Sequence, residues 1–168
     1  TRAIYQLYNT IQNGSNSNFR MGSTNYLFTL TSNHKLHSCR IVYNTLHKTF
    51  RDLYFINNEV SRVICESDGM LFVLNCNWGV PNGLFEICKH GIKIRGMFIE
   101  HQLHGKVEII SDDDKLHNTI EYQNGKRNGY TTFYRDNGTI SKKILFVNDI
   151  QHEHISEFNS AGEFIRFM

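Results

Sequence analysis

Short apolar stretches alternate with turn-forming residues in the C-terminal part of the chain, and the pattern recurs at a fixed interval. Large apolar side chains keep this interval in three sets: Ile110, Tyr134 and Phe158; Leu116, Ile140 and Phe164; Tyr122 and Phe146. Gly138 and Gly162 have the same spacing. A period of roughly 20 to 50 residues is typical of stacked supersecondary units. The sequence therefore predicts a repeat array over residues 105–168.

Each row of this array predicts two strands and two turns. In the segment YTTFY, Tyr130 and Tyr134 share one face, because successive side chains of a strand point to opposite faces. Turn residues that tolerate positive φ follow this segment, at Asn137-Gly138, and Asn124-Gly125 precedes it. We therefore expect an all-β fold, an elongated twisted antiparallel sheet built of successive β-hairpin repeats of 22–24 residues.

Degenerate copies of the row extend toward the N-terminus. The tripeptide at residues 35–37 recurs at residues 115–117, and residues 83–104 form a row of 22. Residues 1–24 lack the pattern and predict an irregular N-terminal cap, since terminal repeats are often atypical. We expect one continuous array over residues 25–168, degenerate over 25–82 and clearer over 83–168.

The clearest row resembles the MORN-repeat family, in the variant form of antitoxin-like MORN arrays. The residues that carry the resemblance are EYQNGKRNGY at 121–130, followed by Phe-Tyr at 133–134 and Asn-Gly at 137–138. The resemblance implies a twisted sheet with an aromatic-lined groove, which serves protein assembly, including self-association, and in some members contacts membrane lipid. Three positions depart from the family pattern, where turn or row glycines are replaced: His101, Asp149 and Glu153.

Composition and charge support a folded β protein and exclude some partners. The chain has 168 residues, 40% of them hydrophobic, with 12 Phe, 8 Tyr and one Pro. Aromatic side chains suit a pleated, half-buried surface. The net charge is +2 and no basic stripe is present, so we expect no nucleic-acid binding.

Candidate catalytic and metal sites have little support in the sequence. The pairs His34/His37 and His101/His104 have odd spacing, which points the two side chains to opposite faces of a strand. The three aspartates at 112–114 fit a hairpin turn, because they lack the spacing of a calcium loop. The sequence contains no nucleophile elbow, P-loop or dinucleotide fingerprint. We expect no enzyme activity, metal or cofactor.

The four cysteines, at 39, 65, 76 and 88, form no C-x-x-C pair, and we expect reduced thiols. No signal peptide or long apolar run is present, which favours a cytoplasmic, intracellular location. Low Ala and Pro with abundant Asn, Ile and Lys suggest a virus or bacterium with an AT-rich genome, and a viral protein would act in the host cell.

The aromatic columns are the candidate binding residues. One column holds Phe98, Tyr122 and Phe146, and a second includes Tyr134, with Tyr130 on the same strand face. Columns of this kind stabilise a sheet through cross-strand pairs, but aromatic side chains are also enriched at interfaces. We expect a non-enzymatic interaction or assembly scaffold whose partner is another protein or a second copy of the chain. The alternatives are a membrane-surface, lipid-binding scaffold and an antitoxin-like inhibitor of a partner protein.

Overall fold

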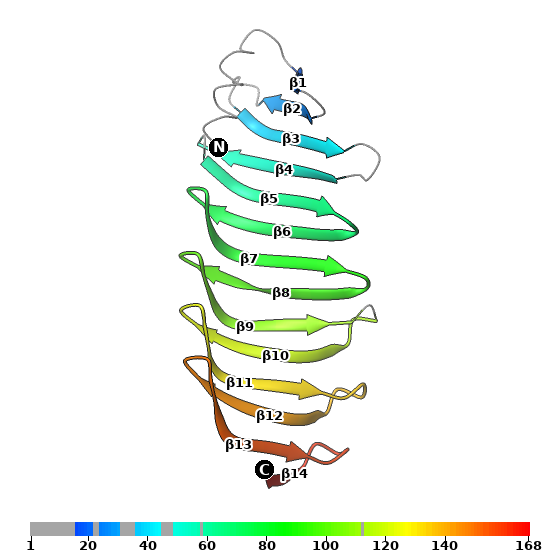
Figure 1. The fold of residues 1–168 in the computed structure, drawn as a ribbon, viewed down its shortest axis with the longest axis vertical. Helices are drawn as coiled ribbons and strands as arrows, with labels where there is room; N and C mark the ends of the chain where they lie inside the picture. The colour runs from blue at the N-terminus through cyan, green and yellow to red at the C-terminus, as the bar shows by residue number, and fades with distance from the viewer. Residues whose placement is uncertain (1–15, 22–23, 31–35, 45–48, 58, 112) are drawn as a thin grey trace. The chain divides into compact units, whose positions relative to one another are not determined.

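The structure is a computed structural model, and it describes residues 16–21, 24–30, 36–44, 49–57, 59–111 and 113–168. Every element within these ranges is a β-strand, and consecutive strands pair antiparallel as hairpins (Figure 1). The prediction of an all-β fold made of successive antiparallel hairpins is therefore confirmed. The chain divides into two units, residues 1–80 and 81–168, which we describe separately.

The described residues of the first unit form six strands, each hydrogen-bonded to the next in sequence order. They are β1 (Asn16–Met21), β2 (Thr24–Leu30), β3 (Leu36–Asn44), β4 (Thr49–Ile56), β5 (Glu59–Ser67) and β6 (Met70–Asn77). β1 lies inside the segment 1–24, for which we expected an irregular cap; residues 1–15 and 22–23 lie outside the described residues.

One face of the first unit carries its hydrophobic core. Side chains less than a tenth exposed pack there from β2, β3, β4 and β5: Phe28, Cys39, Ile41, Leu53, Phe55 and Val60. The register explains this grouping, because Phe28 lies opposite Cys39, which lies opposite Leu53. Residues paired across an antiparallel sheet share a face, so a line of apolar pairs buries one side of the unit.

The second unit shows the period predicted from the sequence. Its strands are β7 (Val80–Lys89), β8 (Ile92–Ile99), β9 (Gln102–Ile110), β10 (Leu116–Gln123), β11 (Lys126–Tyr134), β12 (Ile140–Val147), β13 (Ile150–Phe158) and β14 (Phe164–Phe167). The first residues of β9, β11 and β13 are evenly spaced, and those of β10, β12 and β14 have the same spacing. The row that begins with β7 is slightly shorter, as the sequence also indicates.

The difference between the shorter row and the later rows arises in the loops. β7 and β8 are joined by two residues, His90 and Gly91, both with positive φ. The later hairpins use a five-residue loop instead, in which the first residue donates a backbone hydrogen bond to the fifth. The fourth residue of each such loop has positive φ: Asp114 (57°), Gly138 (80°) and Gly162 (84°).

Two-residue turns close the opposite ends of the hairpins, and they persist where glycine is replaced. Type I′ turns require positive φ at both central residues, which glycine and asparagine adopt most readily. Asn124 and Gly125 have φ of 51° and 79°. His101 and Asp149, which hold the turn position that Gly79 and Gly125 hold in other rows, still adopt φ of 60° and 70°. The replacements therefore leave the turns intact.

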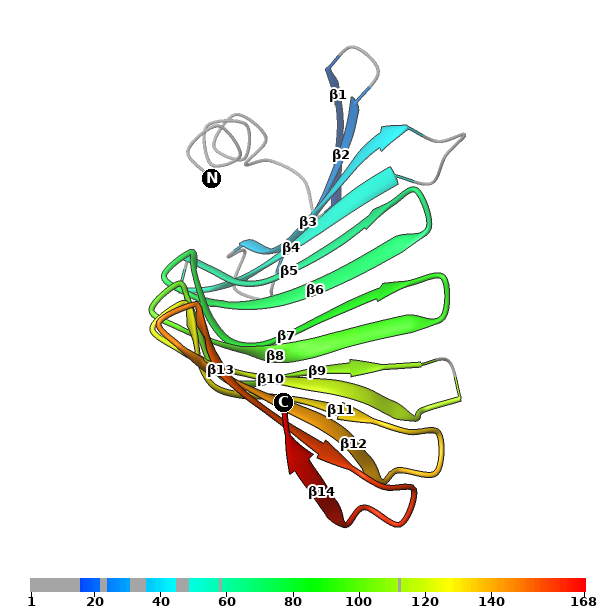
Figure 2. The same ribbon diagram turned by 60° about the horizontal axis from the view of Figure 1, so that its bottom comes forward.

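Each of these turns also binds the preceding row. The backbone N–H of Gly125 donates to the carbonyl oxygen of Leu103 at 2.9 Å, and that of Asp149 donates to the carbonyl oxygen of Arg127 at 2.9 Å. The N–H of His101 donates to the carbonyl oxygen of Pro81 at 2.8 Å. In Figure 2 the strands curve out of the sheet as they approach these turns. The turns therefore form a stacked series of their own.

Candidate interaction surface

The two predicted aromatic groups lie on opposite faces of the second unit. Phe98, Tyr122 and Phe146 share one side, which we call the Phe98 face, with Phe85, whose ring centroid is 5.1 Å from that of Phe98. The Phe98 face continues from strand to strand, because residues that pair across neighbouring strands lie on the same side of the sheet. On this side Val107 pairs with Ile120, Ile120 with Thr131 and Thr131 with Ile144. Tyr130 and Tyr134 point to the other side, as the alternation of the strand predicts.

Each aromatic of the Phe98 column lies across from a glycine with positive φ. The pairs are Phe98 with Gly83, Tyr122 with Gly105 and Phe146 with Gly129. An aromatic side chain that covers the bare backbone of a glycine restores the packing that the glycine lacks. Phe146 is 8% exposed, and Phe98 and Tyr122 are partly buried. The structure therefore gives this column a packing role within the sheet.

Arg127 and Asp149 complete the packing around Phe146. The guanidinium carbon of Arg127 lies 4.1 Å from the ring centroid of Phe146, within cation–π range. The Oδ1 atom of Asp149 accepts a hydrogen bond from the Arg127 backbone N–H at 2.9 Å and another from Arg127 Nε at 3.3 Å. These contacts hold the pKa of the Asp149 carboxyl below its ordinary value.

The opposite side of the second unit is more open, and we call it the Tyr130 face. It carries Tyr130, Tyr134, Lys143, Phe158, Phe164 and Phe167. Tyr130 is 43% exposed. Lys143 Nζ lies 5.7 Å from the ring centroid of Tyr130 and 5.8 Å from that of Phe158, so the ammonium group bridges two aromatic rings. Among the residues that the structure describes, Lys143 forms no ion pair.

The last strand extends the Tyr130 face with two exposed rings. Phe164 and Phe167 are 51% and 62% exposed, and their ring centroids lie 4.8 Å apart. The two side chains share a face because the register shifts by one residue between Glu157 and Phe158, which places Phe164 opposite Phe158. A register shift of this kind leaves one residue, Ile165, as a bulge. The sequence pattern located Phe164 in a column but did not identify it as part of a surface.

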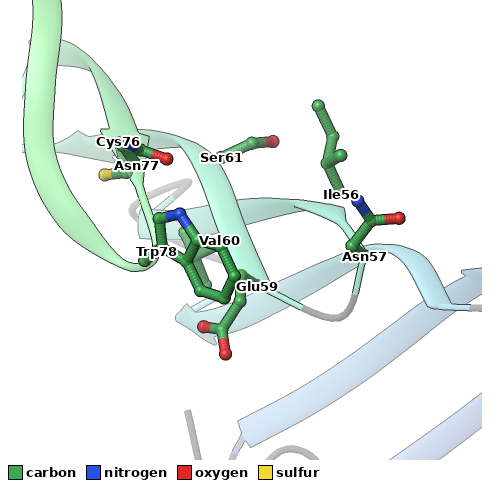
Figure 3. A pocket seen from close by; sticks show the side chains of 8 residues that line it. All are labelled: Ile56, Asn57, Glu59, Val60, Ser61, Cys76, Asn77 and Trp78. Atoms are coloured by element: carbon green, nitrogen blue, oxygen red, sulfur yellow. The ribbon is translucent and has the colours of Figure 1, made fainter.

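A small pocket in the first unit was not predicted from the sequence. Its volume is about 190 Å³, and it is lined by Ile56, Asn57, Glu59, Val60, Ser61, Cys76, Asn77 and Trp78 (Figure 3). Trp78 is 75% exposed. The backbone N–H of Gly79 donates to the carbonyl oxygen of Val60 at 3.1 Å, which holds the Trp78 turn against the start of β5. The signal in the sequence is a tryptophan at a turn position where three other rows have asparagine and one has Glu100.

The other side of the first unit holds one partly buried ion pair that the sequence also did not indicate. Arg40 Nε and Nη2 each lie 2.7 Å from a carboxylate oxygen of Asp52, and the Asp52 side chain is 8% exposed. The guanidinium carbon of Arg40 also lies 4.8 Å from the ring centroid of Phe50. A bidentate pair stacked on an aromatic ring fixes β3 against β4 at this point.

The histidines and aspartates that we considered as metal ligands have other surroundings. His101 lies in a turn, His104 on β9 and His37 on β3, and His34 falls outside the described residues. Hydrogen bonds from Lys115 and Ser111 lower the pKa of Asp113 to about 2. Within the described ranges, no group of three or more His, Cys, Asp or Glu side chains is placed to hold a metal ion.

The cysteines are free thiols in the structure. Cys39 is fully buried, and burial, with a smaller contribution from Asp52, raises the pKa of its thiol to about 12. Burial also raises the pKa of the Cys76 and Cys88 thiols. Since the thiolate is the nucleophilic form, these shifts oppose reactivity at all three positions.

The described residues contain no helix long and apolar enough to cross a membrane. No protein-family model matches this chain, and a comparison with curated protein sequences returns no match.

Proposed function

We propose that the chain is a non-enzymatic protein-interaction module whose docking surface is the Tyr130 face. The observation that carries the proposal is the continuous group of aromatic rings around Lys143, of which Tyr130, Phe164 and Phe167 are each more than two-fifths exposed. Aromatic side chains dominate the energetics of protein interfaces because they bury large areas at a small cost in conformational entropy.

The contrast between the two faces supports this assignment. The aromatic column of the Phe98 face covers glycines and is buried or partly buried. Packing within the sheet therefore explains why these positions are aromatic. The exposed rings of the Tyr130 face lie where no described strand covers them, and exposed apolar groups of this kind mark interaction sites. A partner that covers these rings removes apolar area from water, and Lys143 adds a position for a carboxylate of the partner.

Site-specific photo-crosslinking tests the proposal. Benzoylphenylalanine is placed at Tyr130 or Phe167 and, as a matched control, at Ile92, which is 50% exposed on the Phe98 face. Irradiation in the native cell should give a discrete protein adduct at Tyr130 and Phe167, which Phe164→Ser weakens, and none at Ile92. Equal adducts at all three positions, or no adduct at Tyr130 and Phe167, would contradict the proposal.

Vesicle binding distinguishes this proposal from the alternative of a lipid-binding scaffold. Co-sedimentation with vesicles of phosphatidylcholine, with and without phosphatidylserine, should leave the protein in the supernatant at low salt. Sedimentation with anionic vesicles that is lost in Lys143→Gln would instead assign the Tyr130 face to a membrane surface, since a basic group near anionic lipid contributes about 1 kcal/mol.

A further inference from the structure

Trp78 occupies a backbone conformation that disfavours bulky side chains. It is the first residue of a two-residue turn and has φ of 53°. The same position in other turns is held by Asn57, Asn124 and Asn148, with φ of 49°, 51° and 51°, and by Glu100, with φ of 47°. Asparagine tolerates this left-handed region, whereas a bulky residue there is an outlier. Residues held in such strained conformations cluster at ligand-binding positions.

The strain at Trp78 is not offset by packing, because the side chain is 75% exposed. Its ring instead forms one wall of the pocket of about 190 Å³, with Glu59 beside it and Val60 behind (Figure 3). The apolar part of the lining comes from Ile56 and Val60, and the amides come from Asn57 and Asn77. The pocket therefore combines an aromatic face, an apolar wall and oxygen acceptors.

The charge of the pocket is negative. Glu59 is its one acidic residue, and none of the eight lining residues is Lys or Arg. Glu59 has no ion-pair partner among the described residues. The other ionisable group, the Cys76 thiol, stays neutral because burial raises its pKa. A positively charged ligand group would complement the negative charge of this lining.

We propose that the Trp78 pocket binds the primary ammonium group of a lysine side chain from a partner peptide. The cation would lie against the face of the indole, which attracts it through the ring quadrupole. The N–H donors of the ammonium match the Glu59 carboxylate, which lies beside the indole (Figure 3). The four-carbon stem of lysine suits the apolar wall, because long charged side chains bury their methylene groups on such surfaces.

The lining favours this ligand over two related ones. A quaternary ammonium has no N–H donor, so it leaves the Glu59 carboxylate without a hydrogen bond from the ligand. An ethanolamine headgroup carries a phosphate close to its ammonium, and Glu59 repels that phosphate. The proposal is independent of the Tyr130 face, because every residue of the pocket belongs to the first unit.

Intrinsic fluorescence gives a direct test, because Trp78 is the single tryptophan of the chain. The full chain is titrated with Nα-acetyl-lysine methylamide at constant ionic strength, and with the same compound acetylated on Nε, which is neutral. The lysine compound should produce a saturable change in Trp78 emission, and the Nε-acetylated compound should not.

The variant Glu59→Gln should weaken binding about threefold or more, as expected for loss of a partly exposed charge pair. The matched control is Glu66→Gln, the same substitution on the same strand outside the pocket, which should leave the affinity unchanged. Equal binding of the Nε-acetylated compound, unchanged affinity in Glu59→Gln, or no saturable change overturns the proposal. Tighter binding of the Nε-trimethylated compound overturns the role given to the Glu59 carboxylate as a hydrogen-bond acceptor.

Discussion

The Oε2 atom of Glu121 accepts a hydrogen bond from the backbone N–H of Tyr130 at 2.9 Å. This contact fills the space beside Gly129, where the strand makes a bulge and φ is 122°. A side chain at position 129 would take the place of the Glu121 carboxylate. The orientation of Tyr130 on its face therefore depends on the absence of a side chain at the preceding residue.

Gly129→Ala should destabilise the protein by about 1–3 kcal/mol, measured as the free energy of unfolding in urea. An added Cβ would lie 2.9 Å from the Cβ of Glu121, and alanine also disfavours the backbone conformation. The matched control is Gly105→Ala at the equivalent position of the preceding row, where φ is 73° and no heavy atom lies within 4 Å. Gly105→Ala should cost less, and an equal loss in both variants would contradict the role of Glu121.

Gly96→Ala should destabilise the second unit through overpacking on the Phe98 face. An added Cβ would lie 2.8 Å from Phe85 Cε1 and 2.9 Å from Val107 Cγ2. Overpacking of this kind costs about 1–3 kcal/mol. Combining Gly96→Ala with Phe85→Leu should cost less than the sum of the two single changes, because the smaller side chain makes room. Strict additivity in this double-mutant cycle would show that the two positions do not compete for space.

The Arg40–Asp52 pair should respond unequally to loss of its two partners. Arg40→Leu leaves the Asp52 carboxylate, 8% exposed, without a counter-charge, and should cost about 3 kcal/mol. Asp52→Asn leaves Arg40, whose side chain is 53% exposed and can be hydrated, and should cost about 1–2 kcal/mol. Denaturant unfolding of both variants measures the difference. Equal losses would mean that burial of the carboxylate does not set the cost.

Stability should fall at alkaline pH because of Cys39. Its thiol has a pKa raised from 9.0 to about 12 in the folded chain, so the unfolded chain releases its proton first. The stabilisation is fully present below pH 9.0 and is lost as the pH rises toward 12. Urea unfolding at a series of alkaline pH values should show this loss, and Cys39→Ala should show a smaller one. The partly exposed Cys65 should react with iodoacetamide in the folded state, whereas Cys39 should react only on unfolding.

Trp78→Asn should stabilise the first unit by about 0.5–1 kcal/mol. Asparagine holds this position in three other turns at a similar φ, and the exposed indole contributes little packing. Thermal unfolding followed by circular dichroism measures the change. The same variant should lose the response of the Gly79 amide resonance to Nα-acetyl-lysine methylamide. A lower melting temperature would show that the indole packs favourably despite its exposure.

Much of the second unit can be predicted from the sequence because its turns have a distinctive chemistry. Asn124-Gly125 marks a two-residue turn, and the alternation of apolar residues between turns gives the strand faces. On that basis Tyr130 and Tyr134 share a face in both the sequence pattern and the structure. His101 and Asp149 do not interrupt the pattern, because histidine and aspartate also enter the left-handed region.

The alternation of apolar residues along a strand shows which side chains share a face, but it does not show which face is buried. The candidate surface lies on the face that stays exposed. Phe146 and Tyr130 are both strand aromatics that the sequence makes candidate binding residues, yet Phe146 is 8% exposed and Tyr130 is 43% exposed. The difference arises because Phe146 lies across from a bulge glycine, a relation that depends on register. Arg40 and Asp52 illustrate the same point, since their contact across 12 residues depends on the register between β3 and β4.

The hydrogen bonds from the turns at His101, Gly125 and Asp149 each end on the row directly before. In the second unit, every described turn and strand pairs with its own row or with the row directly before it. Each pairing therefore closes a short loop, and the entropic cost of loop closure is small and similar from row to row. During synthesis, a row can therefore complete its pairing as soon as it leaves the ribosome, using only the row already formed as its template. The order of translation is then also an order of folding, with the newest hairpin always at the open edge.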